Sequence, residues 1–344
     1  MIPAAVLNAQ PGERILDLCA APGGKSTQNA LHMAGQGTIV CNEPIRDRAK
    51  ILSRNVERMG IPNALVVSAW PEDLAKVWPE AFDAIQCDAP CSGEGMFRRH
   101  PESRDEWNPE SPAGCAKRQG DILDSAAIML RPGGRLVYST CTLNTIENEG
   151  VVEDFLRRHD DFTLEAFELP TLSAPTGMLT IYPHRVKGEG HFVALLRRKG
   201  EGTAAWKTTV PKECVPDKAA MKAVQDFLPG SQANLLFGGE LRCCQDFPDL
   251  SKARGVSVLR SGLHLGTVKG KVFVPDHAWA VCNASPDVPR VHLTEEQARL
   301  YQNGHVIPAE GKGWVLACFA GIPLGWGKVS DGMMKNHYPK GLRR

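Results

Sequence analysis

Two loops in this sequence each carry a cysteine in a setting where a thiol can act as a nucleophile. One loop is Asp88-Ala89-Pro90-Cys91-Ser92-Gly93-Glu94-Gly95, and the other is Ser139-Thr140-Cys141-Thr142. Each follows a short apolar run that is typical of a buried strand, so both loops are predicted at the carboxyl-end edge of one parallel sheet. A lone cysteine is most often a small buried hydrophobe. Two thiols at one sheet edge instead predict covalent catalysis.

A thiol pair beside a carboxylate fits the methylation of carbon 5 of cytosine. Carbon 5 becomes nucleophilic when a thiolate adds to carbon 6, and it can then attack a sulfonium methyl group. Asp88 is placed to hydrogen-bond or protonate ring nitrogen 3, and Cys91 can assist the later loss of the carbon 5 proton. Cys19 and Cys41 are expected to line or support the cofactor loop described below. For the remaining cysteines we expect structural roles: Cys87, Cys115, Cys214, Cys243, Cys244, Cys282 and Cys318.

A glycine-containing loop follows the first predicted strand and reads Cys19-Ala20-Ala21-Pro22-Gly23-Gly24-Lys25. Small residues allow a ligand close to the backbone, and the next helix presents free N–H groups. The spacing matches neither the dinucleotide-binding nor the phosphate-binding glycine motif. Glu43 ends the second strand about 20 residues further on, where an acidic side chain can accept ribose hydroxyls. A plain glycine turn and a solvated Glu43 are the alternatives, but the combination favours an adenosine-type cofactor.

Strand-like and helix-like segments alternate through the first 200 residues, which predicts a parallel sheet with helices on both faces. The predicted strands are 14–18, 38–42, 64–67, 82–87, 135–139 and 191–197, and the predicted helices are 25–33, 44–59, 113–130 and 145–158. Residues 131–134 are predicted as a turn. The composition of 200–216 indicates a linker, and short β-like runs at 256–259, 271–274 and 314–319 predict a smaller α+β or β module beyond it.

The composition excludes several classes of protein. The 344 residues carry a formal net charge of +1, unlike a protein that coats nucleic acid, although local basic patches can still bind RNA phosphates. The eleven cysteines are scattered without a CxxC pair, so we expect no metal centre and reduced thiols. No apolar stretch is long enough for a membrane span and no secretory leader opens the chain, so we expect a cytoplasmic protein.

These motifs resemble those of the Fmu/Sun family of RNA 5-methylcytosine methyltransferases, in particular its RsmF-like ribosomal RNA branch. The resemblance rests on the loop 19–25 and on the two cysteine loops, and it runs to about residue 198. The segments 323–328 and 336–339 resemble the RsmF-like C-terminal extension. The resemblance implies an S-adenosylmethionine-dependent catalytic domain with a Rossmann-like sheet over 1–199. It also implies an RNA-binding extension over 217–344 that is PUA-like towards its end.

The resemblance also implies roles for single residues. Cys141 is expected to be the nucleophile and Cys91 to serve product release. The implied cofactor contacts are Cys19, Ala20, Ala21, Pro22, Gly23, Gly24, Lys25, Glu43 and Asp88. Many members carry an Asp for the adenine amino group at the end of the third strand, where this chain has Trp70, so stacking is one way to hold adenine here. Members usually have an RNA-binding segment before the first strand, so we interpret this chain as N-terminally short.

Arg98, Arg99 and Arg104 follow the Cys91 loop and are predicted to contact an RNA backbone, although a solvated surface is the alternative. A target cytosine must be unpaired or flipped out for a thiol to reach carbon 6. We therefore predict a monomeric methyltransferase that acts on ribosomal RNA, with transfer RNA as the alternative substrate. Two rival functions are a small-molecule or protein methyltransferase, which leaves the paired thiols unexplained, and a non-catalytic RNA-binding ribosome-assembly factor, which has no need of Cys141 or Asp88.

Overall fold

The computed structural model describes residues 1–208, 210, 212–244, 246, 248, 253–270, 272–282 and 286–343. The chain forms two compact units. The first comprises residues 1–55, 63–209 and 246–260, and the second comprises residues 56–62, 210–245 and 261–344. The chain thus leaves the first unit within the predicted linker and returns to it for 246–260. In the part of the chain described, no helix combines the length and apolarity needed to cross a membrane.

The first unit contains a mixed sheet between two layers of helices, and its strands β7 and β8 form a separate two-stranded sheet. Its strands are β1 (Arg14–Asp17), β2 (Thr38–Asn42), β3 (Ala64–Ser68), β4 (Phe82–Asp88), β5 (Leu130–Thr140), β6 (Phe162–Leu164), β7 (Phe167–Leu169), β8 (Leu172–Ala174), β9 (Met178–Ile181), β10 (His191–Arg198) and β13 (Ser257–Ser261). Its helices are α1 (Ile2–Leu7), α2 (Gly24–His32), α3 (Arg46–Arg58), α4 (Pro71–Val77), α5 (Ser103–Glu106), α6 (Ser111–Met129) and α7 (Glu149–Arg158), with a 3-10 turn η1 (Glu94–Met96).

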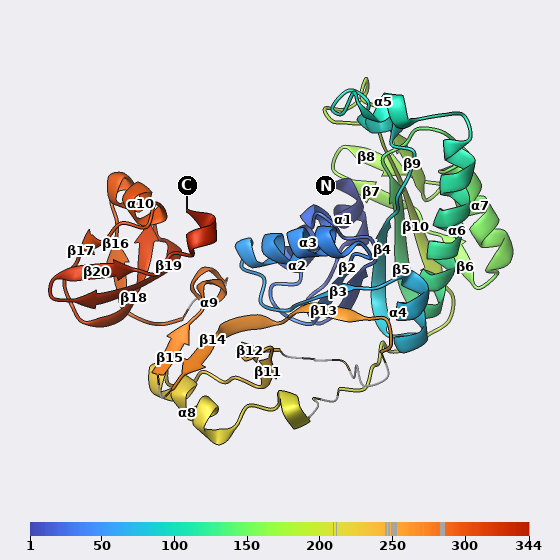
Figure 1. The fold of residues 1–344 in the computed structure, drawn as a ribbon. Coiled ribbons are helices and arrows are strands. Elements are labelled where there is room, and N and C mark those ends of the chain that lie inside the picture. Colours follow the sequence, from blue (N-terminus) through green and yellow to red (C-terminus); the bar gives the residue numbers. More distant parts are fainter. Residues whose placement is uncertain are drawn as a thin grey trace. The chain divides into compact units, whose positions relative to one another are not determined.

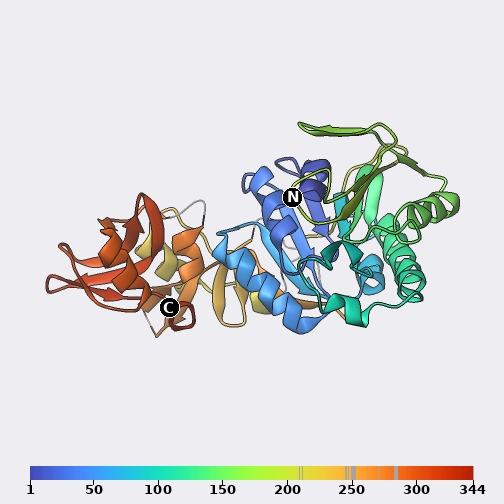
Figure 2. The same ribbon diagram turned by 90° about the horizontal axis from the view of Figure 1, so that it is seen from above.

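The strand order in this sheet is β13-β3-β2-β1-β4-β5-β10-β6, and β9 also pairs with β10. The pairs from β3 through β5 are parallel, whereas β10 runs antiparallel to β5. Helices α1, α2 and α3 cover one face and α4, α6 and α7 cover the other (Figure 1). Figure 2 separates the same layers, with blue α2 and α3 on one side and green α6 and α7 on the other. This arrangement confirms the predicted Rossmann-like α/β class.

Buried strands explain why the sheet forms where the apolar runs predicted it. Every residue of β2 and β3 is buried, which is typical of central strands in a parallel sheet with both faces covered. The turn predicted over 131–134 is wrong, because these residues already belong to β5, where the register with β4 shifts near Phe82. Trp206, in the predicted linker, packs its ring against Trp78 and Phe82 at centroid distances of 5.8 and 5.6 Å.

The second unit consists of two small sheets. Its strands are β11 (Leu235–Phe237), β12 (Glu240–Cys243), β14 (Leu263–Lys269), β15 (Val272–Pro275), β16 (Arg290–His292), β17 (Ile307–Pro308), β18 (Gly313–Phe319), β19 (Ile322–Ser330) and β20 (Met333–Asn336). Its helices are α8 (Lys218–Phe227), α9 (His277–Val281) and α10 (Glu295–Gln302), with 3-10 turns η2 (Lys212–Cys214) and η3 (Lys340–Leu342). The sheet orders are β11-β12-β14-β15 and β16-β18-β19-β20-β17.

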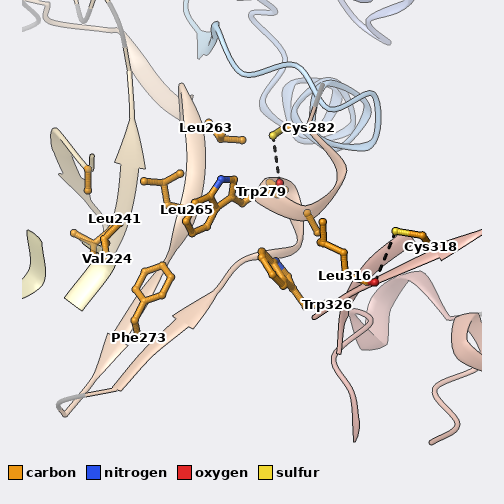
Figure 3. Packing of buried hydrophobic residues seen from close by; sticks show 13 residues of the cluster. Val224, Leu241, Leu263, Leu265, Phe273, Trp279, Cys282, Leu316, Cys318 and Trp326 are labelled. Carbon is orange, nitrogen blue, oxygen red and sulfur yellow. Dashed lines mark hydrogen bonds between the residues drawn. The ribbon is translucent and has the colours of Figure 1, made fainter. Parts of the chain in front are cut away.

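An aromatic core joins the two sheets of this unit. Trp279 of α9 lies between Phe273 of β15 and Trp326 of β19, with both ring centroids 6.0 Å away (Figure 3). The Trp326 Nε1–H donates to the Asp276 carbonyl at 2.7 Å, which satisfies the one polar atom of this buried ring. The β-like runs predicted at 256–259, 271–274 and 314–319 correspond to β13, β15 and β18, except that residue 271 lies outside the described residues.

Candidate active site

The carboxyl ends of β1, β2, β4 and β5 meet at one edge of the first unit, as expected for adjacent parallel strands. A cavity of about 630 Å³ opens at this edge. Its lining includes Cys19, Ala21, Glu43, Trp70, Asp88, Cys91 and Cys141. The three loops that the sequence analysis singled out therefore share one cavity, although they are far apart in the chain.

The two thiols lie in direct contact, with the sulfur atoms of Cys91 and Cys141 3.3 Å apart. The pKa of Cys141 is lowered, chiefly because of its side-chain hydrogen bond with Cys91, and the positive charge of Lys25 acts in the same direction. The same hydrogen bond, together with burial, raises the pKa of Cys91. The pair is therefore asymmetric, with Cys141 as the better thiolate and Cys91 as the thiol that keeps its proton.

Asp88 ends β4 beside the thiols, and its carboxylate is held from two sides. The Lys25 ammonium lies 2.6 Å from one oxygen, and the Ser139 hydroxyl donates to the other at 2.6 Å. Lys25 comes from the cofactor loop and Ser139 from the end of β5, so Asp88 ties three strand-end segments together. These charge-assisted hydrogen bonds fix the direction of the carboxylate.

The loop 19–25 wraps over the ends of β1 and β2. The Ala20 N–H donates to the Asn42 carbonyl at 2.8 Å, and the Asn42 side chain donates to the carbonyls of Leu18 and Ala69. Gly23 has φ +110°, and a Cβ there would lie 2.9 Å from a methyl carbon of Leu52. Because α2 starts at Gly24, its first N–H groups lack intrahelical partners and can receive a polar ligand group.

Glu43 and Trp70 contribute a carboxylate and an indole to the lining of the cavity. The Glu43 side chain is 2% exposed, accepts from the Ile45 N–H at 3.0 Å, and lies 3.3 Å from the Arg48 guanidinium. Trp70 is 54% exposed and is one of the residues that line the cavity. An anchored carboxylate suits ribose hydroxyls and an exposed indole face suits a purine, so the residues present fit the cofactor implied by the resemblance.

Sequence reasoning missed a buried network centred on Glu147. Its carboxylate is fully buried and accepts from the Ser92 N–H at 3.0 Å, from the Gln119 amide at 2.8 Å and from the Asn144 amide at 2.9 Å. The helix predicted from residue 145 starts only at Glu149, because Asn144 and Asn148 bind backbone and side-chain groups of the preceding turn. The cluster of polar residues directly after the Cys141 motif was the available signal.

Two further titratable groups near the cofactor loop were also missed. Burial raises the pKa of Asp17, at the end of β1, to about 7, and the Ser26 hydroxyl donates to one of its oxygens at 2.6 Å. The other carboxylate oxygen is buried without a partner among the described residues. His191 begins β10, and its Nε2 lies 3.9 Å from an Asp88 oxygen.

The arginines predicted to contact RNA lie on the surface after the Cys91 loop. Arg98, Arg99 and Arg104 are all exposed. The Arg98 guanidinium donates to the Gly188 carbonyl at 3.1 Å and pairs with Glu189 at 3.0 Å. A shallow hollow of about 460 Å³ beside it is lined by Arg98 and by the loop from Pro183 to Gly188, which includes His184, Arg185 and Lys187. The hollow therefore has a basic rim.

Two family models match this chain. Residues 4–197 match the family described as 16S rRNA methyltransferase RsmB/F, and residues 288–344 match the methyltransferase RsmF PUA domain. The chain is 35% identical to ribosomal RNA small subunit methyltransferase F of Klebsiella pneumoniae (strain 342), over 100% of this chain and 76% of that protein. It is 34% identical to the protein of the same name from Enterobacter sp. (strain 638), with the same coverage.

Among solved structures, NSun6 from Pyrococcus horikoshii with SFG is similar, with a TM-score of 0.53 and 31% identity over 58% of this chain and 51% of that chain. The chain thus spans about half the length of that protein. The family match spans more than half of this chain, and the relatives align with all of it. The chain therefore belongs to the RsmB/F family of 16S rRNA methyltransferases.

Proposed function

We propose that the protein methylates carbon 5 of a cytosine in ribosomal RNA through a covalent bond between Cys141 and carbon 6 of the base. The observation that supports this most is the contact between two thiols, 3.3 Å apart, in the cavity that also holds Asp88 and Glu43. When bound, S-adenosylmethionine supplies the electrophilic methyl group. A small-molecule or protein methyltransferase gives no reason for the thiol pair, and a non-catalytic assembly factor gives no reason for the lowered pKa of Cys141.

The asymmetry of the thiols supports Cys141 as the nucleophile. Its sulfur forms the bond to carbon 6, and the electron pair of the carbon 5–carbon 6 double bond then makes carbon 5 nucleophilic. After methylation, the carbon 5 proton leaves and the bond between sulfur and carbon 6 breaks, which restores the ring and the Cys141 thiolate. Once Cys141 is alkylated, no thiolate lies beside Cys91, so Cys91 can release its own proton to solvent and accept the carbon 5 proton as the bond between sulfur and carbon 6 breaks.

Asp88 is proposed to hold the polar edge of the base. Lys25 and Ser139 fix its carboxylate next to Cys141, so a cytosine protonated at nitrogen 3 that donates to Asp88 from its N3–H and its amino group is oriented by the protein before the thiol adds. On the cofactor side, Glu43 and the start of α2 are proposed to hold the ribose and the polar end of S-adenosylmethionine, and Trp70 the adenine.

Ribosomal RNA is proposed as the substrate for two reasons. The relatives that align with the whole of this chain are named ribosomal RNA small subunit methyltransferase F, and residues 288–344 match an RsmF PUA domain. Arg98, Arg99 and Arg104 are proposed to contact its backbone, and such contacts weaken as salt rises. Transfer RNA is the alternative substrate, and the experiment below, which traps the covalent intermediate, distinguishes the two RNAs.

The test is to trap the covalent intermediate. Cys91→Ala protein is incubated with S-adenosylmethionine and labelled 16S rRNA or transfer RNA, and denaturing gels report the protein–RNA adduct. We expect an adduct with 16S rRNA, its loss in the Cys91→Ala/Cys141→Ala variant, and its retention in Cys91→Ala/Cys214→Ala, which removes a thiol of the second unit. An adduct that persists without Cys141 would refute the nucleophile, and one formed with transfer RNA instead would refute the substrate.

A further inference from the structure

His191 has a place in the site that the proposed mechanism does not use. It opens β10, directly before Phe192, which pairs with Thr140 in the neighbouring strand, and Thr140 precedes Cys141. The Gly190 N–H before it donates to the Gly95 carbonyl at 3.3 Å, which joins this strand end to the Cys91 loop. The His191 side chain is 19% exposed. The ring therefore lies beside Asp88, which is one of the residues that line the cavity.

The Nε2 atom of this ring is buried without a hydrogen-bond partner among the described residues. It lies 3.9 Å from an Asp88 oxygen, which is too far for a hydrogen bond. A buried polar atom is normally paired, so an unpaired nitrogen this close to a carboxylate that lines the cavity points to a group that a ligand satisfies. The two atoms are too far apart to bond each other, yet close enough to reach the same edge of one pyrimidine ring.

The imidazole is neutral at physiological pH. Burial lowers the pKa of His191 to about 4, since the attraction of the Asp88 carboxylate offsets the burial only in part and the Lys25 ammonium lowers the pKa further. A neutral imidazole has one N–H donor and one acceptor nitrogen. It can therefore donate to a ligand without forming an ion pair with Asp88, which leaves the carboxylate available for the base.

We propose that His191 donates a hydrogen bond from Nε2 to the 2-carbonyl oxygen of the target cytosine, while Asp88 holds the nitrogen 3 and amino positions of the same edge. This inference rests on the proposed function. Addition of the Cys141 thiolate to carbon 6 moves negative charge onto the nitrogen 3 and oxygen 2 side of the ring. A fixed donor at oxygen 2 stabilises that charge in the transition state, as a preorganised oxyanion donor does.

The test uses the trapped cytosine. A 16S rRNA fragment that forms the adduct is synthesised with cytidine or 2-thiocytidine at that position, because sulfur is a weak hydrogen-bond acceptor. Adduct formation is timed under single turnover in Cys91→Ala and in Cys91→Ala/His191→Phe, which keeps an aromatic ring and removes its nitrogens. We expect His191→Phe to slow adduct formation by about tenfold to a hundredfold. We also expect the sulfur substitution to slow the parent but leave the His191→Phe variant unchanged.

Two controls separate recognition of the base from a structural role. His191→Asn keeps an N–H donor and is expected to recover part of the rate, and His32→Phe changes an exposed histidine at the far end of α2 without effect. The dissociation constant for S-adenosylmethionine is expected to stay the same in all variants. If 2-thiocytidine slows adduct formation equally with and without His191, the inference about His191 is wrong, whereas the proposed function is unaffected. Absence of any adduct in the parent overturns the proposed function, and this inference with it.

Discussion

Glu147→Ala is expected to loosen the loop that carries Cys91. The carboxylate of Glu147 receives hydrogen bonds from the Ser92 N–H, the Gln119 amide and the Asn144 amide, at 3.0, 2.8 and 2.9 Å. The residue is fully buried, so water cannot easily replace the lost acceptor. The variant leaves the Ser92 N–H without a partner, whereas Gln119 keeps the Pro90 carbonyl at 3.0 Å.

The magnitude follows from these contacts. An unpaired buried donor costs about 1–3 kcal/mol, and removal of a buried carboxylate relieves part of the desolvation cost. We take about 2 kcal/mol as the net loss for the Ser92 donor, because the Asn144 amide keeps the Glu94 carboxylate and the Thr142 hydroxyl at 3.1 and 3.0 Å. Since each 1.4 kcal/mol corresponds to about a tenfold change in an equilibrium constant, amide exchange over residues 91–95 is expected to accelerate by about thirtyfold.

Hydrogen–deuterium exchange with mass spectrometry measures this locally, without assuming that the two units unfold together. Glu153→Ala is the matched control, because Glu153 is exposed on α7 and its loss is expected to leave exchange in the Cys91 loop unchanged. Adduct formation by Cys91→Ala is expected to slow when Glu147→Ala is added. Acceleration of less than about threefold at residues 91–95 would refute the role of Glu147 in holding this loop.

Gly95→Ala places a Cβ 2.5 Å from the Gly190 carbonyl oxygen and 2.7 Å from that of Cys141, so the rate of adduct formation is expected to fall at least about tenfold. The control Gly114→Ala adds its Cβ in open space on α6 and is expected to have no effect. Equal rates for the two variants in gel assays would contradict this. Trp70→Ala is expected to raise the dissociation constant for S-adenosylmethionine by about tenfold, measured by calorimetry, and Trp70→Phe to restore most of the affinity; no change would exclude stacking on this ring. Because burial raises the pKa of Asp17 to about 7, the folded protein keeps a proton that the unfolded chain releases above about pH 4, so the unfolding free energy without cofactor is expected to fall between pH 4 and 7. Asp17→Asn is expected to remove that decline in thermal scans at pH 5 and pH 8, and an unchanged pH dependence would disprove it.

Local patterns were enough to predict most of the first sheet. The runs at 38–42 and 64–67 predict strands because they are mostly apolar, and both form buried central strands. The sequence predicts a strand at 256–259 but places it in the C-terminal module. In the structure this segment is β13, which lies beside β3 at the edge of the first sheet. Which sheet an edge strand joins depends on contacts with residues that are distant in the sequence, so the strand's own residues do not reveal its partner.

The same division applies to the site. The sequence by itself determined the two cysteine loops, the glycine loop and the acidic strand end, because each is a short motif whose chemistry can be read from its own residues. Only the tertiary structure decided which groups meet, since Cys91 and Cys141 are 50 positions apart and Glu147, Asp17 and His191 belong to no motif that predicts a thiol site. Whether the Cys91 thiol donates to Cys141, and whether His191 is neutral, depends on burial and on distances between strand ends. These are properties of the packed sheet, because desolvation and hydrogen bonding act between side chains that the fold brings together.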